Sequence, residues 1–239
     1  MLIQIGLENN IEGRSLAWAL DFPGCFVYGA DGTEALLKVP QAVLRYANWI
    51  AGHTPDSWLA DLGDFDVRLV DTWDCFGMNE DYDLVPLSAA GEVIEVNAWF
   101  RQDWKPLTGE EVRRGLLMLD WSRADLLASV AGLSEEQLNQ MRPGERWSIN
   151  GILYHVGGAE MWYLDQLDLA GSLWREQLSK VPTERLAMSR AWLKELLPTL
   201  AGAKLVLGKA GEFWSPRKLL RRAIWHELDH VEHIRKLIS

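Results

Sequence analysis

The spacing of apolar side chains changes near residue 105. Before this point, short segments of alternating apolar and polar residues are separated by Gly, Pro, Asn and Asp, which favours short strands and turns. After it, apolar residues recur every three or four positions over long stretches, which favours amphipathic helices. The pattern predicts two domains, residues 1–104 and 105–239, with a boundary near 103 to 107.

The first half predicts a small antiparallel β-sheet with one helix, an α+β unit. Residues 33–50 form the predicted helix, which Thr33 caps and Pro40 interrupts or kinks. The alternating segments predict strands at residues 2–8, 15–20, 25–28, 66–70 and 92–100.

The second half predicts four amphipathic helices and therefore a four-helix bundle. Thr108 with Glu111 predicts the first helix start, Ser148 the second, and Pro216 stands at a tolerated first-turn position of the fourth. The predicted helices span residues 108–130, 148–170, 183–203 and 215–237.

Composition indicates the cellular compartment of the protein. Its 239 residues are 48% hydrophobic, but they include no apolar run of the roughly 20 residues that span a bilayer, and the first residues lack the pattern of a signal peptide. We therefore expect a cytoplasmic protein without a membrane partner. Cys25 and Cys75 are far apart in the sequence and are predicted to be buried thiols.

Charge is divided unevenly between the two halves. Residues 1–104 hold 17 acidic against 5 basic side chains, whereas residues 105–239 hold 17 against 19, which accounts for the net charge of −10. Because nucleic-acid binding depends on clustered basic side chains, we expect no nucleic-acid partner. The acidic first half is compatible with a basic protein partner.

Three of the five histidines lie within the segment WHELDHVEH at residues 225–233. On a helix, His226 and His230 lie about 40° apart around the axis and can reach one metal ion. His233 lies about 10.5 Å along the axis from His226, so the spacing allows either 226/230 or 230/233 as the metal-binding pair. A third ligand must come from elsewhere: His53 lies in a predicted loop, whereas His155 lies on the second predicted bundle helix.

The motifs RWS at 146–148 and LYH at 153–155, followed by WHELDH at 225–230, resemble the DinB/YfiT superfamily of four-helix bundles. The resemblance implies a three-histidine metal site formed by His155, His226 and His230, with His233 near it or at the surface. It also implies zinc, nickel or iron, since imidazole suits all three metals. The neighbouring carboxylates Glu227, Asp229 and Glu232 are then expected to face solvent.

In the first half, DFPGC at 21–25 and GADGTEA at 29–35 resemble the HicB-like antitoxin domain over about the first 50 residues. HicB antitoxins commonly carry a DNA-binding segment after this domain. The present chain shows no basic helix-turn-helix or ribbon pattern there, so the resemblance is limited to the fold.

The resemblance to DinB/YfiT proteins implies a metal-dependent enzyme, either a thiol-dependent S-transferase or isomerase acting on a small molecule, or a hydrolase. No residue is assigned as catalytic. The alternative is a non-catalytic metal-binding scaffold or stress-response module with an acidic partner-binding domain. A solvent-accessible pocket at the metal would favour the enzyme. The polar residues predicted near such a pocket are Arg146, Tyr154, Glu160, Tyr163 and Arg222.

Self-association is also expected. Homodimers are common in the DinB superfamily, and 13 tryptophans are more than one core of this size usually buries. The sequence therefore predicts a homodimer.

Overall fold

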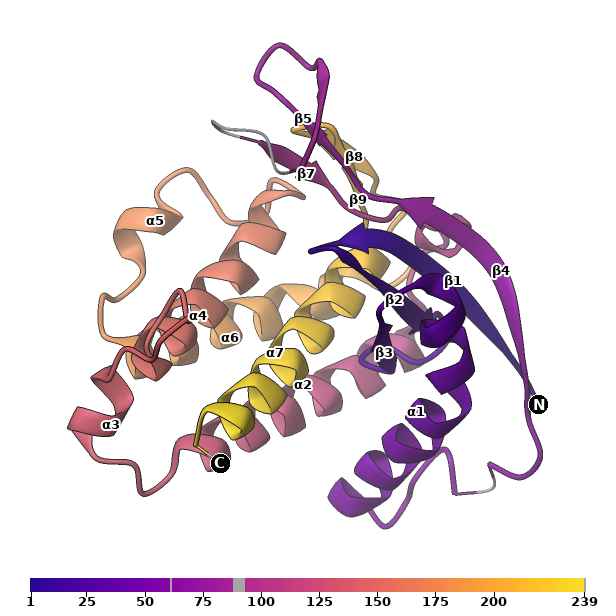
Figure 1. Cartoon of the computed structure of the whole chain (residues 1–239), viewed down its shortest axis with the longest axis horizontal. Coiled ribbons are helices and arrows are strands. Elements are labelled where there is room, and N and C mark those ends of the chain that lie inside the picture. The colour runs from indigo at the N-terminus through magenta and orange to yellow at the C-terminus, as the bar shows by residue number, and fades with distance from the viewer. Residues whose placement is uncertain (61, 88–92, 239) are drawn as a thin grey trace. The chain divides into compact units, whose positions relative to one another are not determined.

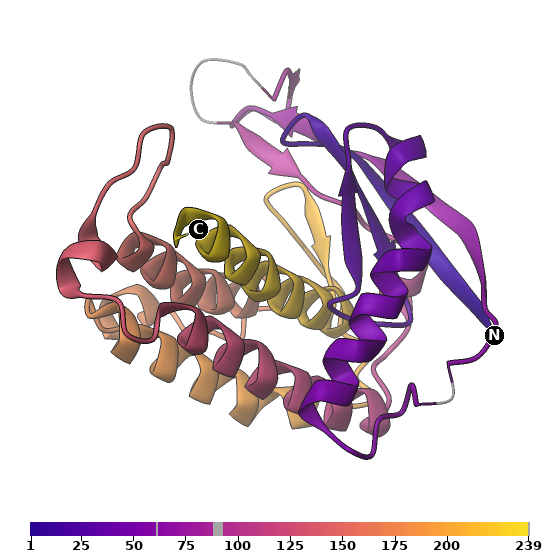
Figure 2. The ribbon, with the colours of Figure 1, turned by 60° about the horizontal axis from the view of Figure 1, so that its bottom comes forward.

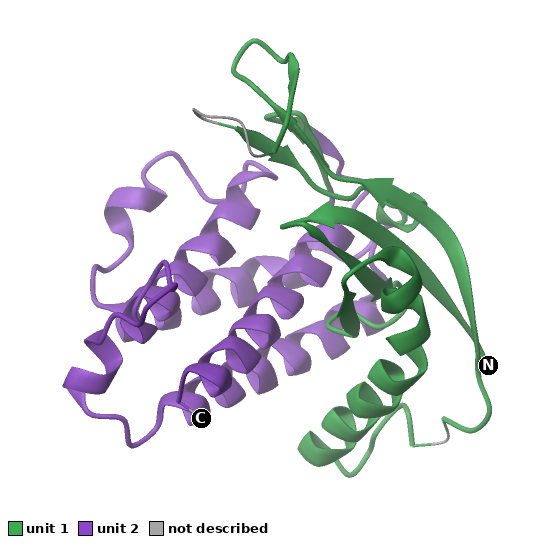
Figure 3. Ribbon diagram, in the orientation of Figure 1, with its two compact units in different colours: residues 1–105, 208–214 green, residues 106–207, 215–239 purple. Residues whose placement is uncertain are grey.

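The computed structural model describes residues 1–60, 62–87 and 93–238 and divides into two compact units (Figure 3). Unit 1 comprises residues 1–105 and 208–214, and unit 2 comprises residues 106–207 and 215–239. The predicted α+β class is confirmed, with a sheet and helix first and helices afterwards. Among the described helices, none is long and apolar enough to cross a bilayer.

The main sheet of unit 1 is mixed. It contains β1 (Leu2–Ile11), β2 (Arg14–Ala19), β3 (Phe26–Gly29) and β4 (Asp66–Asp74) in the order β3-β2-β1-β4. The first three strands pair antiparallel, but β1 and β4 pair parallel. The prediction of a wholly antiparallel sheet was wrong at this pair, because a helix lies between β3 and β4 and a crossover of this kind permits parallel pairing.

That helix, α1 (Gly32–His53), packs against β2 and β3 (Figure 1). It begins after Asp31, whose side chain accepts a hydrogen bond from Glu34 N at 2.8 Å, so the cap lies two residues before the predicted Thr33. The helix continues through Pro40, where the sequence predicted an interruption or a kink. Proline removes one helical hydrogen bond, and the buried apolar face of the helix offsets this loss.

The rest of unit 1 consists of short strands. The three strands β5 (Phe76–Met78), β6 (Leu84–Val85) and β7 (Ile94–Val96) form an antiparallel sheet, and β7 is shorter than the predicted strand 92–100, whose first residue lies outside the described residues. The 3-10 helix η1 (Arg101–Trp104) follows. The hairpin of β8 (Leu207–Lys209) and β9 (Glu212–Trp214) brings Glu212 Oε1 2.5 Å from the backbone N of Asn97, which donates to it.

A fully buried carboxylate, that of Glu8, lies in the core of unit 1. It accepts hydrogen bonds from Trp18 Nε1 at 2.8 Å, from Ala98 N at 2.8 Å and from Cys75 Sγ at 3.3 Å. Cys75 and Cys25 are both free and buried, as predicted, and burial raises the pKa of the Cys25 thiol to about 12. Both thiols are therefore shielded from solvent.

Unit 2 contains the four predicted long helices, which lie side by side in Figures 1 and 2. They are α2 (Gly109–Val130), α4 (Ile149–Asp165), α6 (Pro182–Leu196) and α7 (Pro216–Ile238). Thr108 and Glu111 form the predicted capping box of α2, and Ser148 caps α4. Shorter helices stand between them: α3 (Glu135–Asn139), α5 (Trp174–Gln177) and η2 (Leu197–Leu200).

The bundle core is formed by apolar side chains at helical spacing. Ile149, Ile152 and Val156 of α4 are completely buried, and Val231 and Ile234 of α7 pack in the same cluster. Helix α4 contacts both α6 and α7, and α2 contacts α7. This packing fixes the inward-facing positions of α4 and α7 relative to each other.

Candidate metal centre

Two helices supply the three predicted metal-binding histidines. His155 lies seven residues after the cap of α4, and His226 and His230 lie one turn apart on α7. The Nε2 atoms of His155 and His226 are 2.9 Å apart, and those of His226 and His230 are 3.2 Å apart. Each of the three residues offers a ring nitrogen, and these nitrogens lie within 4.8 Å of one another. The predicted trio is therefore brought together.

The trio is largely buried, and burial favours the neutral form of the rings. His226 and His230 are each 9% exposed, and His155 is half-buried. Burial, followed by the charge of Arg146, lowers the pKa of His155 to about 4. Burial, together with its histidine neighbours, lowers the pKa of His230 to about 3 and that of His226 well below its ordinary value. Neutral imidazole is the form that binds a metal.

The donor set fits a divalent cation. Nε2 of His226 faces Nε2 of both other histidines and has at most one proton to share, so a hydrogen bond satisfies only one contact at a time. A cation would accept the lone pairs of all three rings. The Nδ1 atom of His230 is buried and has no hydrogen-bond partner among the described residues, so a metal bound at Nε2 would leave the Nδ1 proton without a protein acceptor there.

An aromatic stack holds the His155 ring. The indole of Trp147 stacks on it, with centroids 4.4 Å apart and planes 23° apart, and the Arg146 guanidinium lies 4.5 Å from the Trp147 ring centre. Gly151 makes the room, since a Cβ there would lie 2.9 Å from Cβ of Trp147. On the other side, the Tyr163 and His226 ring centroids are 6.1 Å apart. The rings are thus positioned by packing.

His233 does not join the trio. Its Nε2 lies 2.9 Å from a carboxylate oxygen of Glu145, and its ring centroid lies 5.9 Å from that of His230. With its side chain 33% exposed, it occupies the edge of the site. The pair formed in the structure is therefore 226/230, one of the two that the spacing allowed.

One expectation about the carboxylates was wrong. Glu227 was expected to face solvent but is 1% exposed, whereas Asp229 is half-buried and Glu232 is exposed. Glu227 stands about 100° around the helix from His226 and reaches α2 and α6, where it accepts hydrogen bonds from Ser122, Arg123 and Arg190. The face of α7 beside the histidines is therefore also buried.

Glu227 belongs to a buried ion network with Glu160, Arg123 and Arg190. Glu160, 2% exposed, lies 3.0 Å from Arg123 Nη2 and accepts a hydrogen bond from Arg190 Nε at 2.8 Å. Ser189 also donates to Glu160 at 2.7 Å. Burial raises the pKa of Glu160, but Arg190 and Arg123 outweigh it and hold the pKa below its usual range. Two carboxylates and two guanidiniums leave the network electrically neutral.

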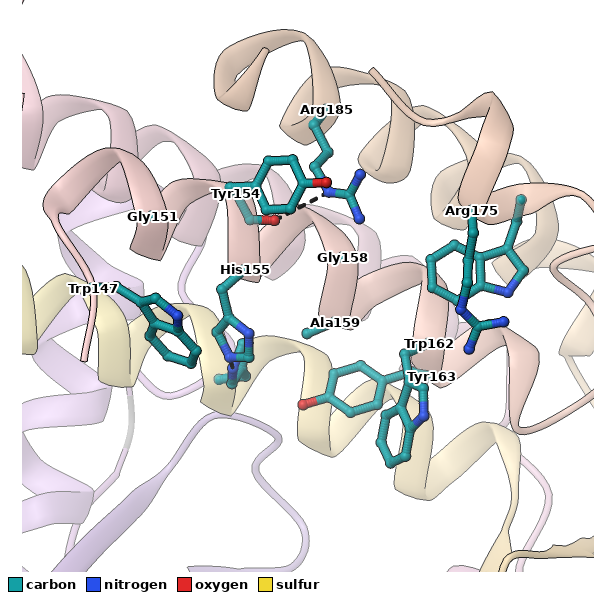
Figure 4. A pocket seen from close by; sticks show the side chains of 12 residues that line it. Trp147, Gly151, Tyr154, His155, Gly158, Ala159, Trp162, Tyr163, Arg175 and Arg185 are labelled. Atoms are coloured by element: carbon teal, nitrogen blue, oxygen red, sulfur yellow. Dashed lines mark hydrogen bonds between the residues drawn. The ribbon is translucent and has the colours of Figure 1, made fainter. Parts of the chain in front are cut away.

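A pocket of about 620 Å³ opens beside the trio, with His155 and His226 in its wall (Figure 4). Of the polar residues predicted there, Tyr154 and Tyr163 line it. The other three do not: Glu160 lies in the ion network, Arg146 lies over Trp147, and Arg222 lies 4.6 Å from the ring centre of Trp225.

Two pocket residues, Arg175 and Arg185, were missed by sequence reasoning. They come from α5 and α6, and their positions depend on tertiary packing. The only local signal was the pair Gly157-Gly158 inside a helix, which marks a close approach of another side chain.

Comparison with known families agrees with this geometry. Residues 118–234, which contain all three histidines, match the model of the DinB superfamily. These residues form a DinB superfamily domain. No curated protein and no solved structure matches the chain. The family of the N-terminal sheet and helix is unassigned, so the HicB-like resemblance stays a prediction.

Proposed function

We propose that this DinB domain binds one divalent metal ion through His155, His226 and His230 and catalyses a reaction of a small molecule in the adjoining pocket. The observation that carries the proposal is the position of the trio: two of its rings form part of the wall of a pocket of about 620 Å³. A purely structural zinc site is coordinated by four protein ligands, so it has no open position and needs no pocket. This arrangement favours the enzyme over the non-catalytic scaffold.

Three imidazole ligands would leave at least one coordination position of a bound ion open to a substrate or water. The bound ion would supply a Lewis acid that lowers the pKa of a coordinated thiol or water. The chain contributes the rest: Trp147 fixes the plane of His155, and the aromatic side chains of Trp162 and Tyr163 reduce the access of bulk water. Zinc, nickel and iron all suit a site formed by imidazoles.

The reaction class follows from the resemblance to DinB/YfiT proteins. We propose transfer of a low-molecular-weight thiol, such as bacillithiol, mycothiol or glutathione, to a small electrophile, or a thiol-dependent isomerisation. In a transfer to an aryl chloride, the thiolate sulfur forms the new S–C bond, the C–Cl bond breaks, chloride leaves and the thiol proton passes to solvent. Conjugate formation is measured from the absorbance of the product.

Metal analysis tests the site apart from the reaction. Protein purified without a nickel column should contain close to one equivalent of a divalent metal. Replacing His226 by Ala should abolish stoichiometric binding, because it removes the ring that contacts both others. Replacing His233 by Ala is the matched control and should leave most of the metal, because its ring is turned to Glu145. The reverse pattern would show that the 226/230 assignment is wrong.

The reaction is tested with the three thiols and an aryl chloride. Wild-type protein should form conjugate with one of them, and the His226→Ala variant should lose this activity. A metal-loaded protein that accelerates none of these reactions would contradict the thiol-transfer class while leaving the metal site intact.

A further inference from the structure

The pocket beside the histidines holds a buried cation without a partner carboxylate. Arg185 of α6 is 7% exposed, and it forms no ion pair within the described residues. Burial lowers the pKa of Arg185 from the ordinary arginine value, and the Tyr154 side chain opposes this shift. Three other buried arginines of the bundle, Arg123, Arg190 and Arg217, are paired with carboxylates. Buried charges are costly unless they are paired, so Arg185 is suited to receive an anionic group.

Helix α4 is built around this side chain. A Cβ on Gly158 would lie 3.0 Å from Nη2 of Arg185, and a Cβ on Gly157 would lie 3.0 Å from its Cγ. Each glycine inside a helix costs about 1 kcal/mol relative to alanine. Two consecutive glycines therefore weaken α4 at the place where Arg185 crosses it. A side chain at position 158 would crowd the guanidinium, and one at position 157 would crowd Cγ of Arg185 and the α6 backbone.

The guanidinium is held by the protein but not saturated. Nε donates to the backbone oxygen of Tyr154 at 3.1 Å, and Nη1 donates to that of Ser179 at 3.3 Å. The Tyr154 ring lies 4.0 Å below the cation. The Tyr154 side chain also interacts with the guanidinium, but the two backbone hydrogen bonds use Nε and Nη1, so Nη2 can donate to a ligand.

The surroundings of Arg185 suit a small anion with an apolar body. The described lining of the pocket contains no Asp or Glu, and it includes a second arginine, Arg175, which is exposed. The remaining wall is mainly aromatic, with Tyr154, Trp162 and Tyr163 on the same helix as His155 (Figure 4). A positively charged pocket therefore exists in a chain with a net charge of −10.

We propose that Arg185 binds the carboxylate or phosphate group of a small molecule whose apolar body lies against the aromatic side chains of α4. Gly158, beside the guanidinium, is three residues from His155, which is about 4.5 Å along the helix axis. A ligand anchored on Arg185 would thus present its other end to His155 and His226. The anion site is argued from the contacts of Arg185 alone. Only the role of the opposite end of the ligand, near the histidines, rests on the proposed function.

Wild-type protein gives a test that needs no variant. Benzoate, phenyl phosphate and the neutral benzamide are titrated by calorimetry, once in chelator and once after loading with zinc. In chelator, the preferred anion should bind at least about tenfold more tightly than benzamide, the ratio expected for a charge-assisted hydrogen bond. The tighter of the two anions identifies the group as carboxylate or phosphate. Equal binding of all three compounds in chelator would overturn the proposal.

Variants locate the anion. Arg185→Gln should weaken the preferred anion by about tenfold or more and leave benzamide unchanged, and Arg185→Lys should have an intermediate effect because it keeps the charge but loses the fork. Arg175→Gln is the matched control, with an expected loss of less than about threefold, because its cation is exposed. Circular dichroism checks that each variant is folded. Loss with Arg175→Gln but not with Arg185→Gln would refute the assignment.

Metal stoichiometry separates the two proposals. If zinc fails to bind but anion affinity in chelator still depends on Arg185, the anion site stands and the metal-dependent function fails. If zinc binds to the three histidines while Arg185→Gln keeps full anion affinity, the metal site stands and the anion site fails.

Discussion

Replacing Glu227 by Gln tests whether the buried ion network depends on its balance of charges for stability. The side chain is 1% exposed and accepts hydrogen bonds from Ser122, Arg123 and Arg190. The substitution keeps the size but removes one negative charge, so the network changes from neutral to a net charge of about +1. It also turns an acceptor into a group whose NH₂ faces guanidinium donors.

The expected cost follows from this imbalance. Removing one partner of a buried ion pair lowers the free energy of unfolding by about 3–5 kcal/mol, because an uncompensated charge stays buried. For a chain of this size, about 2–4 °C of melting temperature corresponds to each kcal/mol, so a decrease of roughly 6–20 °C is expected. Urea unfolding followed by circular dichroism at a fixed pH, in chelator, measures the change without a contribution from metal binding.

Two further variants make the test specific. Glu232→Gln on the same helix is the control, since Glu232 is exposed and pairs only with the exposed Arg235 in the described structure, and it should change stability by less than about 0.5 kcal/mol. Adding Arg123→Gln to Glu227→Gln restores neutrality and should be less destabilising than the sum of the two single changes. A Glu227→Gln protein within about 1 kcal/mol of wild type would refute the reasoning.

The remaining predictions concern pH, assembly and chain division. Because the pKa values of His155 and His230 are lowered to about 4 and 3, the unfolded chain binds more protons below pH 6.5, and the metal-free protein should lose up to about 1.4 kcal/mol per histidine per pH unit between about pH 6.5 and 4. Urea titrations at several pH values measure this, and a His230→Gln variant with an unchanged slope would contradict it. We expect a homodimer at micromolar concentration, and a monomeric mass from light scattering would reject it. Limited proteolysis should cut first near residues 103–107, as judged on a denaturing gel, and a first cut inside α2 would count against the predicted boundary.

The sequence was sufficient where local periodicity decides the structure. Helical spacing placed His226 beside His230, and caps at Thr108 and Ser148 set the starts of α2 and α4. His155 was found by elimination and by the resemblance, because only one other histidine lay on a predicted bundle helix. These signals depend on residues a few positions apart, which the sequence shows directly.

The sequence was insufficient where residues far apart in the chain decide the structure. Whether Glu227 faces solvent depends on arginines of α2 and α6 more than 35 residues away, and charge alone favours an exposed position. Arg185 was not recognised because its room comes from glycines on another helix. The parallel pairing of β4 with β1 likewise depends on where the chain returns after α1, and the alternation of side chains is the same in parallel and antiparallel pairs.

The β8–β9 hairpin has a consequence for how the gene of this protein can recombine. The chain passes from unit 1 to unit 2 after residue 105, returns for residues 208–214 and then passes back, so three covalent crossings join the units. A gene fragment ending or starting near residue 105 would therefore separate the hairpin from the rest of its own unit, including the contact between Glu212 and Asn97. Recombination could not exchange the helical unit as a single continuous cassette without carrying part of its neighbour along. A helical unit moved together with residues 208–214 would leave residues 1–105 without their hairpin.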